Sequence, residues 1–142
     1  MRASALLLVL ALAALAAGCG GGGKSAEQKA QDQVCSARTD IQKQLDDLKG
    51  LTVSPTSVPA LTTALGAIKG DLQSIANAQG QLSGQRKQAA KSAAQTFGSQ
   101  LGTITGNLVS GITSGNTAQS QLDAAAQQLA AGFKQAFAPV AC

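Results

Sequence analysis

The sequence predicts an all-α fold, an up-down-up-down four-helix bundle that follows a hydrophobic leader and a glycine-rich tether. Apolar residues recur at spacings of three and four in four separate segments, as they do along one face of an α-helix. Clusters of Gly, Pro, Ser and Asn separate these segments. An even number of helices also places Cys142, after the last segment, beside Cys35 in the first half of the first segment.

The first 18 residues have the three parts of an export signal. Arg2 gives a positive start, the run from Ala5 to Ala17 is apolar, and the small residues Ala17 and Gly18 come next. A run of about 13 residues is too short to cross roughly 30 Å of hydrocarbon as a permanent helix. The alternatives are a plain secretory signal that is cut elsewhere and an uncleaved N-terminal anchor.

The stretch Leu15-Ala16-Ala17-Gly18-Cys19 resembles the lipobox of bacterial lipoproteins. The resemblance implies that residues 1–18 are a lipoprotein signal peptide and that Cys19 becomes a lipid-bearing N-terminus. Two or more acyl chains, such as palmitate, anchor stably, because each buried methylene contributes about 0.8 kcal/mol. We therefore expect a lipid-anchored protein on the extracytoplasmic face of the cell membrane or of an outer membrane.

The remaining charges and cysteines agree with export. Without Arg2 the chain keeps ten basic and seven acidic side chains, a mild excess that lacks the concentrated basic face of a nucleic-acid-binding protein. With lipid on Cys19, Cys35 and Cys142 remain as an even pair in an oxidising compartment, which predicts a disulfide. Two free thiols are the alternative.

Residues 19–24 are predicted to be a flexible tether, and residues 25–142 the helical bundle domain. Gly18 to Ser25 also matches the G-x-x-x-x-G-K-[ST] pattern of a phosphate-binding loop. That loop connects a buried strand to a helix, whereas the apolar run before Gly18 is an export leader. We expect no nucleotide and no other cofactor.

The first two helices have clear boundaries in the sequence. Ser25 and Gln28 predict a capping box, and Gly50 predicts a left-handed end to the first helix. The apolar stripe of this helix is Val34, Ala37, Ile41, Leu45 and Leu48. Residues 51–59, with two prolines, predict a connection. The seam of the second helix is Val58, Leu61, Leu65, Ile68, Leu72 and Ile75.

The third helix is predicted over 86–112, although glycines at 98, 102, 106 and 111 interrupt its second half. A short strand at 102–106 is the alternative. The spacing of four between the glycines at 98, 102 and 106 is similar to the small-residue pattern of closely packed helices, and slack packing would give the same pattern. Asn116 and Gln119 predict the cap of the fourth helix, and Pro139 limits it. Its stripe is Leu122, Ala126, Leu129, Phe133, Ala136 and Val140.

The sequence offers no catalytic or metal-binding constellation. It has no histidine, so the usual base for a Ser or Cys nucleophile is missing and zinc has too few ligands. Most of its acidic residues fall on faces opposite the apolar stripes, as solvated side chains do. Arg86, Lys87 and Lys91 form the one basic cluster, which predicts either contact with anionic lipid or wall polymer, or a solubilising face.

These observations predict a non-enzymatic binding or structural module that holds an unidentified protein or polymer at the cell envelope. The alternative is a carrier of a small apolar or lipid-like ligand between the helices. The carrier hypothesis rests on the thin Ala- and Gly-rich core around Phe97, Phe133 and Phe137.

Overall fold

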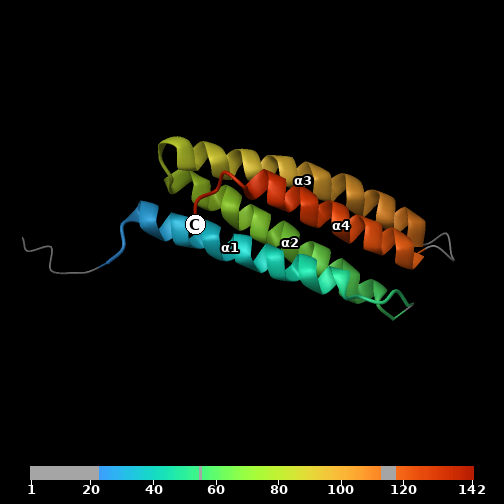
Figure 1. Cartoon of the computed structure of the whole chain (residues 1–142). Coiled ribbons are helices and arrows are strands. Elements are labelled where there is room, and N and C mark those ends of the chain that lie inside the picture. Colours follow the sequence, from blue (N-terminus) through green and yellow to red (C-terminus); the bar gives the residue numbers. More distant parts are fainter. Residues whose placement is uncertain (1–22, 55, 113–117) are drawn as a thin grey trace, which may run out of the picture.

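A computed structural model describes residues 23–54, 56–112 and 118–142. These residues form a four-helix bundle in which each helix packs against its neighbours in the chain and α1 also packs against α4 (Figure 1). The helices are α1 (Ala26–Lys49), α2 (Val58–Ala78), α3 (Gly84–Ile112) and α4 (Ala118–Phe137), and a 3-10 turn, η1 (Gln79–Gln81), follows α2. The predicted all-α, up-down-up-down architecture is confirmed.

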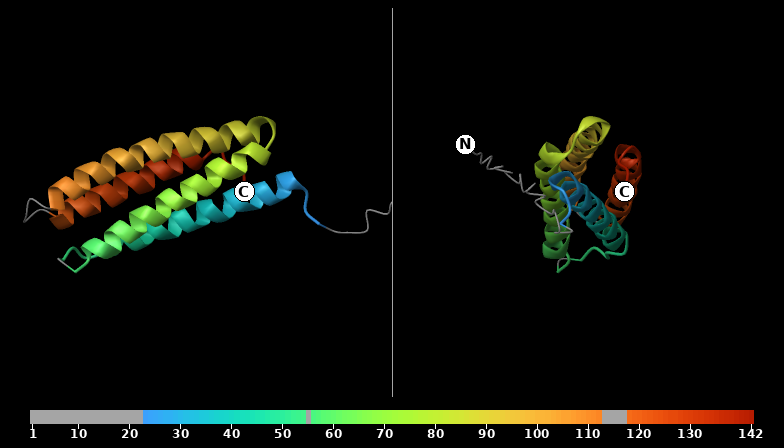
Figure 2. Two further views of the ribbon diagram at one scale, coloured as in Figure 1. Left: turned by 180° about the vertical axis from the view of Figure 1, so that it is seen from behind. Right: turned by 90° about the vertical axis from the view of Figure 1, so that its left-hand side faces the viewer.

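The start of α1, η1 and the last residues of the chain lie at one end of the bundle, which we call the base (Figure 1). At this end the hydroxyl of Ser83, shortly after η1, donates to Glu27 Oε1 in the first turn of α1 at 2.7 Å. Seen from behind, α2 lies in front of α1 and α3 lies in front of α4 (Figure 2). The α1–α4 edge and the α2–α3 edge are therefore on opposite sides of the bundle.

Of the two predictions made for the ends of α1, one is confirmed and one is wrong. The capping box is confirmed: Gln28 N–H donates to Ser25 Oγ at 3.2 Å, and Ser25 N–H donates to Gln28 Oε1 at 2.9 Å. The left-handed end predicted at Gly50 is wrong, because Gly50 has φ −86° and ψ −3°. Its N–H still donates to the carbonyls of Asp46 and Asp47, so the helical turn continues through it.

The second helix begins earlier than predicted. It starts at Val58, so Pro59 lies inside its first turn, where a missing N–H costs no helical hydrogen bond. Val58 is 41% exposed and does not belong to the buried seam. Leu61 is the first buried residue of α2, because Val58 stands at the end of the helix beyond the last layer of the core. The other five predicted seam residues are buried.

The third helix is continuous from Gly84 to Ile112, so the predicted helix is confirmed and the strand at 102–106 is not formed. Its buried residues include Ala90, Ala93, Phe97, Leu101 and Leu108. A sharp turn precedes it, and Gly84 has φ +53°, a conformation that only glycine adopts without strain.

Three phenylalanines fill the core between α3 and α4. Phe97 is edge-on to both Phe133 and Phe137, with ring centroids 5.4 and 6.1 Å apart, and Phe133 lies 4.7 Å from Phe137. Edge-to-face aromatic pairs at these separations are favourable beyond their buried area. Phe137 is fully buried, although the sequence stripe omitted it.

Replacing Phe137 by Ala will lower the free energy of unfolding by about 3–5 kcal/mol, because it removes a buried ring and leaves a cavity. Urea denaturation followed by circular dichroism measures the change. Val58→Ala, on an exposed residue, is the control and will stay within about 0.5 kcal/mol of the wild type. Equal losses in the two variants would contradict this account of the core.

Candidate functional site

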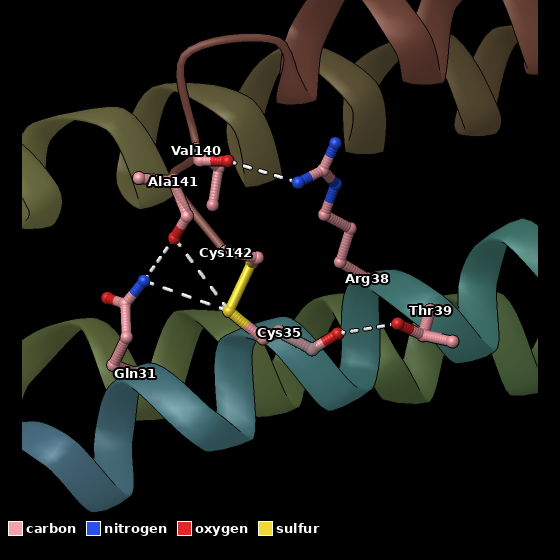
Figure 3. The surroundings of a disulfide bond; sticks show 7 residues. All are labelled: Gln31, Cys35, Arg38, Thr39, Val140, Ala141 and Cys142. Atoms are coloured by element: carbon pink, nitrogen blue, oxygen red, sulfur yellow. Dashed lines mark hydrogen bonds between the residues drawn. A yellow bond between two sulfur atoms is a disulfide. The ribbon is translucent and has the colours of Figure 1, made fainter.

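A disulfide between Cys35 and Cys142 fastens the end of the chain to α1, with the two Cα atoms 5.6 Å apart (Figure 3). Two side chains of α1 hold the same segment. Arg38 Nη1 donates to the carbonyl of Val140 at 3.1 Å, and Gln31 Nε2 donates to the carbonyl of Ala141. The structure therefore contains the pairing that the even cysteine count predicted, and its role is to close the bundle at the base.

The structure divides the predicted basic cluster. The guanidinium of Arg86 lies 3.8 Å from Glu27 Oε1, so its charge is already paired at the base. Lys87 is exposed beside it. Lys91 lies further along α3, away from the base, and lines a groove between α2 and α3. The three residues therefore do not form one unpaired cationic patch.

The groove between α2 and α3, which we call the α2–α3 groove, has a volume of about 660 Å³. Its lining residues are spaced by three and by one along both helices, so one stripe of each helix faces it. Leu65, Leu72 and Leu101 supply the apolar part of the lining, together with Ala76 and Ala94. A volume of this size lies within the range of small-molecule sites, and an apolar lining is typical of them.

Glycines leave the groove open. A Cβ atom added at Gly66 or Gly102 would meet nothing within 4 Å, and one added at Gly98 would lie 3.9 Å from Leu72 Cδ1. These three glycines of the groove therefore provide empty space and not close backbone contact. Each glycine costs about 1 kcal/mol relative to Ala inside a helix, so the glycines that leave this space also lower the stability of α2 and α3.

The charged groups of the groove have one sign. Lys69 on α2 and Lys91 on α3 line it, and neither has an ion-pair partner among the residues that the structure describes. No Asp or Glu is among the lining residues. At the base end, Gln79 also lines the groove, and its Oε1 atom is buried without a hydrogen-bond partner in the described part of the chain.

The acidic residues lie outside the groove, and several of them make other contacts. Hydrogen bonds from Lys49 and Gln42 lower the pKa of Asp46, which lies on the exposed side of α1. Asp71 accepts a hydrogen bond from Gln44 Nε2 at 2.9 Å. Over 23–54, 56–112 and 118–142, no three potential ligands gather to hold a metal ion. In the same ranges no helix is long and apolar enough to span a bilayer.

Some predicted features fall on residues that are not described. Cys19, the proposed lipid site, and Gly18 lie outside the described residues, as does Asn116, the predicted cap of α4. The last two residues of the phosphate-loop pattern are described: Lys24 pairs with Asp32, and Ser25 caps α1. The cap partner Gln119 is also described, and its side chain bonds the backbone of the connection after α1, at Leu51 and Val53.

No protein-family model, curated protein or solved structure matches the chain. The sequence identified Lys91 as basic and the glycines as unusual, but it did not join them into one site. One pattern in the sequence does indicate the two faces of the groove. It is a repeated spacing of three and one, at 65, 66, 69, 72 and 73 on α2 and at 94, 95, 98, 101 and 102 on α3.

Removing the disulfide will destabilise the bundle. The bridge closes a loop across a sequence separation of 107, for which the chain-entropy model gives a stabilisation of up to about 5 kcal/mol. The variant carrying Cys35→Ser and Cys142→Ser, compared with the wild type by urea denaturation, will show a loss in that direction. Adding a reductant will bring the wild type to the level of the variant and leave the variant unchanged. An equally stable variant would contradict the role of the bridge.

Proposed function

We propose that this protein is a lipid-anchored lipoprotein of the cell envelope and acts there as a non-enzymatic binding module. The lipobox resemblance at Cys19 supports the anchor. The Cys35–Cys142 disulfide supports an oxidising, extracytoplasmic compartment, since such bonds are rare in the cytosol. The scattered acidic residues and the lack of histidine support a role in binding and not in catalysis.

The anchor limits the distance between the base and the membrane. The seven residues from Cys19 to Ser25 reach at most about 25 Å when fully extended. Since α1 begins at the base, the proposed anchor keeps the base within that distance of the lipid. The end of the α2–α3 groove that contains Lys91 and Gln79 is then the end nearest the lipid.

The α2–α3 groove is the observation that carries the binding role. It is open and mostly apolar, and its glycines lower helix stability without improving the packing between the helices. A structural spacer gains nothing from such a surface. Of the two roles that the sequence allows, holding a large partner and carrying a small apolar or lipid-like ligand, a groove of about 660 Å³ favours the carrier.

Photocrosslinking in intact cells tests the binding role. A photoreactive residue in place of Gln73, which lines the groove, will capture a lipid-like ligand in good yield. The same residue in place of Gln127, which is exposed on α4, is the control and will capture little. Capture of a protein or wall polymer from position 73 would support the other binding role. Equal capture from both positions would contradict binding in the groove.

Mass spectrometry of the N-terminal peptide tests the anchor. In the Cys19→Ser variant the lipid attachment atom is missing, so the N-terminal peptide will carry no acyl mass and signal-peptide removal at Gly18 will fail. Mass spectrometry of that peptide measures both effects. Cys35→Ser is the matched control and will keep the acylated N-terminus. An unmodified Cys19 in the wild-type protein would contradict the proposed anchor.

A further inference from the structure

We infer that the α2–α3 groove binds a single-chain amphiphile with an anionic head group, of the class of fatty acids and lysophospholipids. This inference names the ligand class of the proposed carrier and so rests on that function. The acyl chain lies along Leu72 and Leu101, and the head group lies at the base end beside Lys91.

The length of the groove fits one acyl chain. Its lining residues on α3 run from Lys91 to Thr105, a rise of about 21 Å at 1.5 Å per residue. One acyl chain occupies half of a bilayer core of roughly 30 Å, or about 15 Å. A chain of that length, with its head group at Lys91, ends near Gly102, where the lining is still apolar and small.

The charges of the groove select an anion. Lys69 and Lys91 have no acidic partner in the part of the chain that the structure describes, and no carboxylate lines the groove to repel an anionic head group. Lys69 lies midway along the groove, where its methylenes can cover the acyl chain while its ammonium group reaches water. Gln79, which also lines the groove at its base end, is polar and uncharged and so does not oppose an anionic head group.

The same charges argue against a second copy of the bundle as the occupant. Two copies that met through this groove would bring four lysines together around an apolar surface, and like charges at short range repel. An acidic amphipathic helix of another protein also satisfies the charge, and its capture at position 73 is an outcome that would overturn the inference.

The glycines provide matched variants that fill the groove or leave it open. Gly66 and Gly102 line the groove and have free space where a side chain would go, so Gly66→Leu and Gly102→Leu place a side chain in the path of the acyl chain. Gly70 and Gly106 lie one helical turn further along the same helices, have equally free space, and do not line the groove. Gly70→Leu and Gly106→Leu are therefore the controls for the change in helix propensity.

The experiment uses the full-length lipidated protein in nanodiscs of phosphatidylcholine, with a diazirine fatty acid and its uncharged methyl ester as probes. Photolabelling followed by peptide mapping reports the site. The fatty acid will label α2 and α3 in the wild type and in both control variants. Labelling will fall at least tenfold in Gly66→Leu and Gly102→Leu, and thermal unfolding of each variant will show that it remains folded.

The head-group assignment has its own variants. Lys91→Gln, which keeps the groove open, will lower labelling by the fatty acid at least threefold and leave labelling by the ester unchanged. Lys87→Gln, on the exposed lysine that does not line the groove, is the control. Equal labelling by acid and ester in the wild type, or full labelling in Gly66→Leu, would overturn the inference. Capture of a protein or polymer at position 73 would overturn it and leave the proposed binding role standing.

Discussion

The bundle depends on the attachment of the end of the chain to α1. No loop joins α1 to α4, so other contacts must close this edge. They are the Cys35–Cys142 bond, the hydrogen bonds to Val140 and Ala141, and the packing of α4 on α1. The opposite edge, between α2 and α3, is joined covalently through η1 and packs less completely, because glycines occupy its flanks. The α1–α4 edge is therefore covalently closed, whereas the α2–α3 edge carries the glycine-lined groove.

The helices could be predicted because they depend on local sequence patterns. The disulfide could be predicted because an even number of helices brings Cys142 back to the end of the bundle where Cys35 lies. The period of the apolar residues sets the buried face of α1 and α4, and Ser25 sets the start of α1. The burial predicted for Val58 and the left-handed conformation predicted for Gly50 are wrong. At a helix end, local packing and hydrogen bonds decide these properties more than the apolar period does. Val58 has no further layer of the core to cover it, and Gly50 keeps the hydrogen bonds of the turn before it.

The groove could not be predicted in the same way. Helical spacing shows which residues share a face, but it does not show which flank a neighbouring helix leaves uncovered. That depends on the register of two helices, in which Gly98 comes opposite Leu72. The basic cluster was misleading for the same reason. Arg86 and Lys91 are five residues apart, yet one is paired with Glu27 at the base and the other lines the groove.

The proposed anchor and the groove fit together through the base. In the proposed arrangement the tether keeps the base within about 25 Å of the membrane, and Lys91 and Gln79 line the groove at its base end. We propose that an amphiphile from the bilayer enters at this end, with its acyl chain along the apolar lining. Gly66, Gly98 and Gly102 line the groove, and their lack of side chains leaves the space that the proposed acyl chain would occupy.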